Sequence, residues 1–368
     1  MLTRHFLPAA LAAALLLSGC AAIDESSAPQ LKRTEVLGVM ERVADWQLSH
    51  PSTRPANGWV QAAGYTGMSA LAEISSSPRF EDALLKMGAQ NSWTLGPRIY
   101  HADDHCVAQT YAELYFRHHD PAMIGPATQR FDAIIAHPTP SGAEFNDTDR
   151  SLNWWWCDGL FMGPPAWLRM WKATGKQAYL DFAVENWWKT SDFLYDKEEH
   201  LFFRDASYFQ RREANGKKVF WSRGNGWVFA GLARVLQYLP ENHPARPRFE
   251  QQFREMAAKL VTVQQPDGFW RSSLLDPENY PAQEESGTGF YCFGLLWGVN
   301  HGLLDRATCL PAGLKAWAAL LSCVQPDGKL NHVQPIGADP KKFDPNATEP
   351  YGVGAFLLAG SEAYRLAK

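Results

Sequence analysis

Asp158 stands in the surroundings best suited to acid chemistry anywhere in this chain. It follows the run Trp154-Trp155-Trp156-Cys157 and precedes the uncharged residues 159–165. Aromatic faces stack against sugar rings, and apolar walls raise the pKa of a carboxyl group. A carboxyl that stays protonated near neutral pH acts as a general acid. The alternative is a core aromatic cluster in which the aspartate only caps a helix.

A second stretch places one guanidinium between two indoles. Arg223 lies between Trp221 and Trp227 in the sequence Trp-Ser-Arg-Gly-Asn-Gly-Trp. A guanidinium binds a carboxylate through two parallel hydrogen bonds, so this stretch predicts an acidic sugar as substrate. A purely structural ion pair between Arg223 and Asp158 or Asp104 is the alternative.

Two further carboxylates stand side by side at Asp103 and Asp104, flanked by His101, His105 and Cys106. We expect Asp103 to cap a helix and Asp104 to point into the site, because an acidic pair from different segments is the usual equipment of a glycosidase. A metal site made of these neighbours is the alternative. It is disfavoured because adjacent residues rarely face one ion together.

Composition excludes some classes of protein. The net charge is −4 over 368 residues and no basic block occurs, so extensive nucleic-acid binding is not expected. The 15 tryptophans favour carbohydrate binding. No Cys-x-x-Cys pair supports a zinc site. Among the cysteines after Cys20, Cys309 and Cys323 are the easiest pair to imagine bridged.

The N-terminus has the pattern of a bacterial targeting signal. Arg4 and His5 precede an apolar run, and Leu17-Ser18-Gly19-Cys20 resembles a lipobox. We therefore expect a signal peptide over residues 1–19, a lipidated Cys20 with a tether over 20–34, and a single domain over 35–368. This predicts a lipoprotein of the cell envelope, facing the periplasm and sorted to the outer membrane if the host is Gram-negative. An ordinary cleaved signal is the alternative.

An internal repeat indicates how these residues are positioned. Glycine-containing or aspartate-containing helix starts recur at six places, and long apolar stretches with helical spacing follow them. The six starts are 57–59, 103–105, 158–160, 224–227, 286–290 and 351–356. Strands are expected only as a short hairpin that joins 202–204 to 219–221 through a turn at Asn215-Gly216.

Six helical hairpins are most simply closed into a ring, so the repeat predicts an all-α fold, an (α/α)6 barrel with all six starts at one rim. The rim would gather Trp59, Asp104, Asp158, Arg223 and Trp227, together with Glu285 or Glu349. An open helical solenoid is the alternative. A shared cavity is favoured because each repeat carries aromatic and polar groups at the same end.

Taken together, the motifs around Asp158, Arg223 and Asp104 resemble glycoside hydrolase family 105, the unsaturated rhamnogalacturonyl hydrolases. The similarity covers roughly residues 35 to 365. Family 88, the unsaturated glucuronyl hydrolases, is the nearest relative and has the same fold. The resemblance implies an enzyme that removes a 4,5-unsaturated uronic acid from oligosaccharides made by polysaccharide lyases, without a metal or organic cofactor. The acid protonates the vinyl ether double bond and water adds to the ring carbon beside the ring oxygen.

The resemblance also implies roles for individual residues. Asp158 matches the general acid and base, and Asp104 matches the second carboxylate of the site. Positions lining the sugar subsite match His200, Trp221, Arg223 and Trp227. Some members of the family place a His-Lys pair before the catalytic aspartate, whereas residues 149–154 here read Asp-Arg-Ser-Leu-Asn-Trp.

That departure keeps alternative substrates open. Besides unsaturated galacturonyl units from rhamnogalacturonan, the expected substrates include unsaturated glucuronyl units from ulvan, arabinogalactan or glycosaminoglycan. Two alternatives of other classes remain at this stage. One is a non-catalytic glycan-binding surface lipoprotein, and the other is a helical toroid with a structural role.

Overall fold

A computed structural model describes residues 31–138 and 154–368 of the chain, and the account below concerns these residues. Residues Leu31–Lys368 form one unit. Cys20 and the expected signal peptide lie outside the described residues. No helix in the described part is both long enough and apolar enough to cross a bilayer.

Helices dominate the described chain. The α-helices are α1 (Arg33–Ser49), α2 (Trp59–Ile74), α3 (Arg79–Gln90), α4 (Ala102–His105), α5 (Ala108–His118), α6 (Gly125–Ala136), α7 (Gly159–Met162), α8 (Pro164–Thr174), α9 (Gln177–Leu194), α10 (Ser222–Leu236), α11 (Arg246–Val263), α12 (Glu285–Asn300), α13 (Arg306–Leu321) and α14 (Pro350–Leu366). Short 3-10 helices are η2 (Pro121–Met123) and η3 (Ala206–Tyr208), and the strands are β1 (Tyr195–Asp196) and β2 (Leu201–Phe202).

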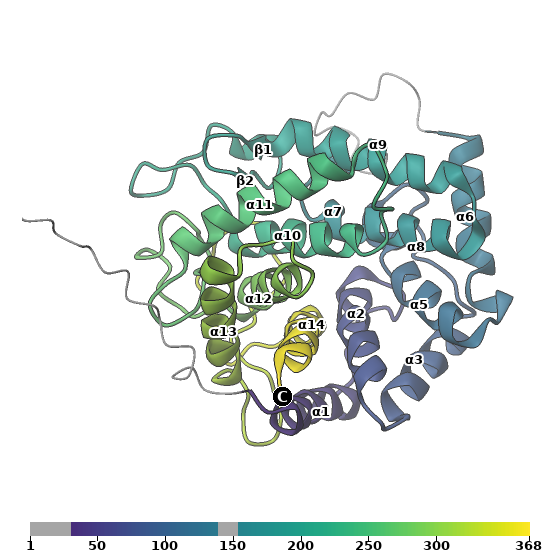
Figure 1. Cartoon of the computed structure of the whole chain (residues 1–368), viewed down its shortest axis with the longest axis horizontal. Helices are drawn as coiled ribbons and strands as arrows, with labels where there is room; N and C mark the ends of the chain where they lie inside the picture. The colour runs from purple at the N-terminus through teal and green to yellow at the C-terminus, as the bar shows by residue number, and fades with distance from the viewer. Residues whose placement is uncertain (1–30, 139–153) are drawn as a thin grey trace, which may run out of the picture. The chain divides into compact units, whose positions relative to one another are not determined.

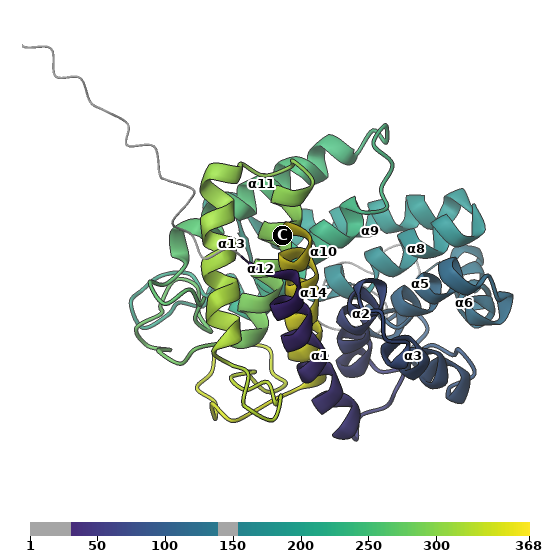
Figure 2. The ribbon, with the colours of Figure 1, turned by 60° about the horizontal axis from the view of Figure 1, so that its bottom comes forward.

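The helices form two concentric layers (Figure 1). The inner helices α2, α5, α8, α10, α12 and α14 contact one another in a closed circuit, in which α14 packs on α2 and α2 packs on α5. The outer helices α1, α3, α6, α9, α11 and α13 pack outside this circuit, as Figure 2 shows for α1 and α13 beside α14. The all-α (α/α)6 barrel predicted from the repeat is confirmed.

Burial distinguishes the two layers. Every residue of α10 is buried, because this inner helix is covered on all sides. Only six of the 18 residues of the outer helix α11 are buried, and they form one face of the helix. A helix that is apolar all round belongs in a core, whereas a one-sided helix belongs at the surface.

The circuit closes through a backbone contact between the first and last inner helices. A Cβ atom added at Gly67 of α2 would lie 2.3 Å from the carbonyl oxygen of Gly354 in α14. A Cβ atom added at Gly354 would lie 2.3 Å from the carbonyl oxygen of Ala63. Only residues without a side chain allow the helix axes to approach this closely.

Two local expectations need correction. The hairpin pairs β2 with β1, through Tyr195 with Phe202, and not with residues 219–221. Asn215-Gly216 does form a turn, but it closes the isolated bridge between Arg212 and Lys218. Pairing of β2 with β1 is favoured over pairing with residues 219–221 because the connection between β1 and β2 is short and local.

The second correction concerns the cysteines. The five in the described part, Cys106, Cys157, Cys292, Cys309 and Cys323, are all free. Cys309 lies near the start of α13 and Cys323 lies just beyond its end. The intervening helix spans about 20 Å at 1.5 Å per residue, which is far beyond the reach of a disulfide.

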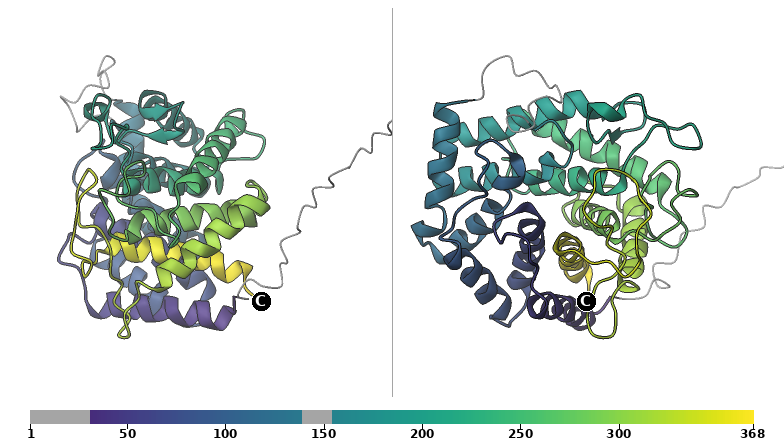
Figure 3. Two further views of the ribbon diagram at one scale, coloured as in Figure 1. Left: turned by 90° about the vertical axis from the view of Figure 1, so that its left-hand side faces the viewer. Right: turned by 180° about the vertical axis from the view of Figure 1, so that it is seen from behind.

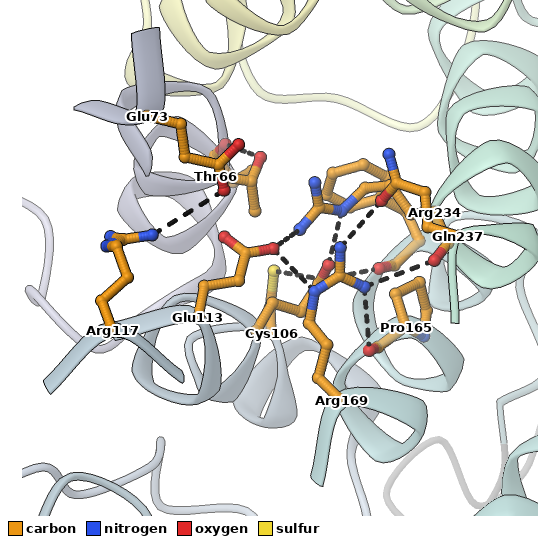
Figure 4. A network of polar contacts seen from close by, with 12 residues as sticks. Thr66, Glu73, Cys106, Glu113, Arg117, Pro165, Arg169, Arg234 and Gln237 are labelled. Atoms are coloured by element: carbon orange, nitrogen blue, oxygen red, sulfur yellow. Dashed lines mark hydrogen bonds and ion pairs between the residues drawn. The ribbon is translucent and has the colours of Figure 1, made fainter. Parts of the chain in front are cut away.

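A buried charge network lies near the C-terminal ends of the inner helices (Figure 4). The Oε1 atom of Glu113 accepts hydrogen bonds from Arg169 Nε at 2.7 Å and from Arg234 Nη2 at 2.9 Å. These residues line a cavity of about 230 Å³ together with Glu73 and Gln237. Burial raises the pKa of Glu113, but the attraction of the two guanidiniums outweighs burial and holds it at about 2. Its charge therefore ties α5, α8 and α10 together.

We predict that Glu113→Gln lowers the free energy of unfolding by about 3–5 kcal/mol, because two buried guanidiniums lose their shared carboxylate. Since the pKa of Glu113 is depressed, its stabilisation is complete above its ordinary value of 4.5 and is lost as the pH falls through about 2. Urea unfolding at a series of pH values measures both effects. The control is Glu185→Gln, which removes an exposed partner of Lys189. Equal losses of stability in the two variants would contradict the account.

Candidate active site

The six predicted helix starts lie together at one end of the ring. The helices α2, α4, α7, α10, α12 and α14 begin at or within a few residues of these starts, and the short helices α4 and α7 lead directly into the inner helices α5 and α8. In the left view of Figure 3, yellow α14 runs from the end where the long loops gather toward the C-terminus at the other end. The loop end is therefore the N-terminal rim of the inner helices, opposite the network around Glu113.

Asp158 lies at the start of α7 without capping it, since its side chain accepts no cap hydrogen bond. The residue is 9% exposed. Burial raises the pKa of the carboxyl, while the charges of Arg204 and Arg223 oppose the rise. The Nε atom of Arg204 lies 3.8 Å from Asp158 Oδ2, and the thiol of Cys157 lies 3.6 Å from the same oxygen. A buried carboxyl that has a raised pKa and keeps a small exposed fraction is equipped to donate a proton.

The two adjacent aspartates both contact Arg98, but Asp104 binds it much more tightly than Asp103 does. Asp104 accepts hydrogen bonds from the backbone N–H of Arg98 at 2.6 Å and from its Nε and Nη2 at 3.1 and 2.7 Å. This bidentate pair fixes the loop that leads into α4. The negative charge of Asp104 is therefore paired with Arg98, and its side chain does not simply point into the ring as expected.

Asp103 occupies the position facing the acid. The N-cap of α4 is His101, so the expected capping role of Asp103 is wrong. Burial raises the pKa of Asp103 to about 7, Arg98 opposes this rise, and the nearby charge of Asp158 adds to it. His101 Nδ1 lies 3.6 Å from Asp103 Oδ2, and burial lowers the pKa of His101 to about 4. Asp103 thus lies near a neutral imidazole and a second carboxyl, and 3.5 Å from Nη2 of Arg98.

His105 does not join a metal cluster with these residues. Its Nε2 lies 2.8 Å from the carbonyl oxygen of Ile99, and its Nδ1 accepts a hydrogen bond from Trp167 Nε1 at 3.2 Å. Both ring nitrogens are therefore occupied within the core. No group of three or more potential metal ligands occurs among the residues that the structure describes.

Arg223 is 1% exposed and lies between aromatic faces. Its guanidinium carbon lies 4.6 Å from the ring centre of Trp221 and 4.9 Å from that of Tyr351. Nη1 donates to the carbonyl of Gln334 at 2.5 Å, and Nη2 donates to that of Pro335 at 3.1 Å. The predicted cation is at the rim, but two of its nitrogens hold a loop of the protein itself.

The predicted tryptophans differ in how much surface they offer. Trp59 is half-buried and stacks on Tyr351 at 5.6 Å between ring centres. Trp221 and Trp227 are each 1% exposed, and Trp227 packs on Phe290 in the core. Of the three, only Trp59 presents a face to solvent at the rim.

The three consecutive tryptophans before Asp158 also differ in what they contact. Trp154 donates its indole N–H to the carbonyl of Tyr100 and packs edge-on against Phe182. The ring of Trp156 lies 4.5 Å from that of His101, and the ring of Trp155 lies beneath Arg204 at 5.1 Å. Trp154 therefore belongs to the core, while the other two support groups beside the acid.

His200 is not brought to these residues. It lies in the turn between β1 and β2 with a positive φ of 55°. Its Nδ1 lies 3.0 Å from the hydroxyl of Tyr195 and 3.5 Å from the carboxylate of Glu255 on the outer helix α11. These contacts tie the hairpin to the outer layer.

Comparison with known proteins decides the family. The profile of glycosyl hydrolase family 88 matches residues 36–367. The chain belongs to glycosyl hydrolase family 88. The expected resemblance to families 105 and 88 is thereby confirmed, and the chain is a glycosidase by family.

Individual relatives agree over nearly the full length. The chain is 37% identical to an unsaturated 3S-rhamnoglycuronyl hydrolase of Formosa agariphila, over 91% of this chain and 92% of the relative. It is 35% identical to a protein of the same name from an Alteromonas species, over 92% and 88%. A solved structure named a polysaccharide lyase superposes with a TM-score of 0.82 and 34% identity, over 90% of this chain and 97% of that one.

Two residues near Asp158, Arg204 and Asp103, were not predicted from the sequence to belong to the site. Arg204 follows Phe202-Phe203, which the sequence marks only as a strand. Asp103 was expected to cap a helix, which left Asp104 to point into the site. Arg98, six residues before Asp104, was the available signal, since a guanidinium near the start of a helix pairs with one of two aspartates.

We predict opposite effects from the two adjacent aspartates. Asp104→Asn should lower the melting temperature, because it breaks the bidentate pair with Arg98. Asp103→Asn should leave the melting temperature unchanged or raise it at pH 7 and reduce turnover. The raised pKa of Asp103 means that folding is penalised as the pH rises from 3.8 to about 7, and asparagine removes that penalty. Thermal unfolding of both variants from pH 4 to 8 measures this, and a larger loss of stability in Asp103→Asn would refute the assignment.

Proposed function

We propose that this protein hydrolyses oligosaccharides that carry a 4,5-unsaturated uronyl unit at the non-reducing end, linked to rhamnose. The observation that carries the proposal is a buried carboxyl, Asp158, with a raised pKa beside two guanidiniums. Both relatives named above act on unsaturated rhamnoglycuronyl compounds according to their names. Their names combine a glycuronyl unit, a term that covers glucuronyl and galacturonyl units alike, with rhamnose. Carbon 4 is trigonal in the unsaturated unit, so both parent sugars give the same group and the glucuronyl and galacturonyl alternatives differ only in the parent polysaccharide. The physiological partners are then acidic oligosaccharides released by polysaccharide lyases.

The reaction begins with the protonated carboxyl of Asp158. It donates its proton to carbon 4 of the vinyl ether, and positive charge develops on carbon 5 and the ring oxygen. Water adds to carbon 5 and returns a proton to the Asp158 carboxylate. The hemiketal opens to a ketone, and the resulting hemiacetal at carbon 1 releases the leaving sugar. The net change is the addition of one water molecule, and the acid ends the cycle as it began.

The neighbours of Asp158 have distinct tasks in this proposal. Asp103, rather than the expected Asp104, is the second carboxylate, because Arg98 holds Asp104 through three hydrogen bonds and has only one longer contact, 3.5 Å from Nη2, with Asp103. Arg204 takes the uronate carboxylate, since its Nε is buried without a hydrogen-bond partner among the described residues. Trp59 supplies the exposed aromatic face for the sugar ring. The wall of the site is held in place by Arg223, Trp221 and Trp227. His200 supports the hairpin between β1 and β2, outside the site.

A second candidate is an elimination reaction. It is favoured by one observation, the solved structure named a polysaccharide lyase at 34% identity. A lyase forms the conjugated double bond, whereas a hydrolase of unsaturated uronides removes it. The two activities therefore change the ultraviolet absorbance in opposite directions. A non-catalytic glycan-binding protein would leave the ultraviolet absorbance unchanged.

We predict that the purified protein decreases the ultraviolet absorbance of the unsaturated uronyl group in lyase-treated rhamnose-containing polysaccharide. Asp158→Asn should reduce this rate by about 10²–10⁴-fold, because an amide cannot donate the proton. Its melting temperature should be retained, and Asp181→Asn on the outer helix α9 serves as the matched control. An increase in absorbance would support the lyase, and full activity of Asp158→Asn would show that another group is the acid.

We also propose that the chain is a lipoprotein anchored to the bacterial envelope through Cys20. The support is the sequence Leu-Ser-Gly-Cys after an apolar run. Cys20→Ala should move the protein from the membrane fraction to the soluble fraction of cells that express the full chain. Retention in the membrane fraction would contradict the anchor, and Cys309→Ala is a control that should not change the distribution.

A further inference from the structure

A cavity lies beside Glu113, at the end of the barrel opposite Asp158. Its volume is about 230 Å³, and side chains from all six inner helices line it. One buried water molecule needs only about 10–15 Å³ of such space, so the cavity has room for a ligand of several heavy atoms. No step of the proposed reaction uses this end of the barrel.

Arg234 presents an unpaired donor to this cavity. The residue is 3% exposed and lines the cavity. Its Nε donates to Gln109 Oε1 at 2.7 Å, and its Nη2 donates to Glu113 Oε1 at 2.9 Å. Its Nη1 has no hydrogen-bond acceptor among the residues that the structure describes, yet this nitrogen retains accessible surface. A guanidinium nitrogen without an acceptor is a donor available to a ligand.

The charges at the floor of the cavity are unequal. Arg169 and Arg234 share Oε1 of Glu113 (Figure 4), and no other carboxylate in the described part of the chain forms an ion pair with either guanidinium. Arg169 is otherwise satisfied, because its Nη1 and Nη2 donate to the carbonyl of Pro165 and to Gln237. Burial and the charge of Arg169 lower the pKa of Arg234 to about 10. Two buried cations with one anion leave one positive charge uncompensated, and buried charges are costly unless they are paired.

The other carboxylates that line the cavity are paired elsewhere. Glu362 accepts a hydrogen bond from Arg365 at 2.7 Å. Glu73, whose side chain is 45% exposed, lies on the solvent-facing side of the cavity, 3.6 Å from Arg365 and 3.8 Å from Arg117. Burial raises the pKa of Glu73, while the charges of these two arginines oppose the rise. Neither carboxylate forms an ion pair with Arg234, so the excess positive charge at the floor remains.

We propose that the cavity is a binding site for a small anion that carries a carboxylate or another oxyanion group. The oxyanion accepts hydrogen bonds from Nη1 of Arg234 and from the hydroxyl of Tyr238, which also lines the cavity. It supplies the missing negative charge to a guanidinium that Gln109 and Glu113 already hold in place. Two sources have this chemistry, an inorganic anion such as sulfate and a sugar acid of monosaccharide size.

Isothermal titration calorimetry in a buffer of low ionic strength tests the site directly. Inorganic sulfate and D-glucuronate are titrated into separate samples of the purified protein. At least one of them should bind saturably, with one anion per chain in the cavity. Because the attraction is electrostatic, binding should weaken as sodium chloride is added.

Three variants assign the bound anion to the cavity. Ala70→Leu fills the cavity without changing any charge, so it should remove one bound anion per chain and retain the melting temperature. Arg234→Gln should weaken binding about 10–100-fold, because a hydrogen bond to a charged group is lost. Glu73→Gln should strengthen binding about two- to fivefold, because a partly exposed like charge is removed. Arg254→Gln, which breaks an exposed pair with Glu250 on the outer helix α11, is the charge-matched control and should bind as the wild type does.

The comparison of the two anions identifies the source of the ligand. Binding of sulfate alone supports an inorganic ligand, and binding of D-glucuronate, with or without sulfate, supports a sugar acid. Failure of both anions to bind overturns the proposal, as does binding that persists unchanged in Ala70→Leu. Ala70→Leu decides the question even where Arg234→Gln does not fold, since it leaves the charge network intact. The measurement does not involve hydrolysis, so its result is independent of the proposed function.

Discussion

The site depends on closure of the inner ring, and closure depends on the contact between α2 and α14. Gly67 and Gly354 let the two backbones approach to distances that no side chain permits. This contact brings Trp59, at the start of the first inner helix, against Tyr351, at the start of the last. Without it the six helix starts would lie along an open superhelix, and the acid would have no opposite wall.

Closure creates the burial that raises the pKa of Asp158, and the nearby cations limit that rise. Burial favours the neutral acid, whereas Arg204 and Arg223 favour the carboxylate left after the proton has been donated. A group used alternately as acid and base needs both influences. At the opposite end of the barrel, burial and nearby cations also have opposing effects on a carboxyl group. There the two guanidiniums outweigh burial and keep Glu113 ionised, so that its charge has a structural role.

The sequence allowed the barrel and the rim to be predicted, because six similar helix starts repeat along the chain and a ring places them together. It also allowed Asp158 to be singled out from its apolar neighbours. The sequence did not show which of Asp103 and Asp104 would be paired with Arg98, because this depends on where the guanidinium of Arg98 lies in the folded chain. The subsite roles of Trp227 and His200 stay predictions. Residue type and motif do not reveal that Trp227 packs on Phe290 or that His200 contacts Glu255.

The central claim is that Asp158 protonates a carbon atom and does not attack the glycosidic carbon. Turnover in D₂O, with early NMR spectra of the released uronate, tests it most directly. The account predicts one deuterium on a single face of carbon 4 in the wild-type product, and product formation slowed by about 10²–10⁴-fold in Asp158→Asn. A product released without deuterium at carbon 4, with the double bond intact, would contradict it.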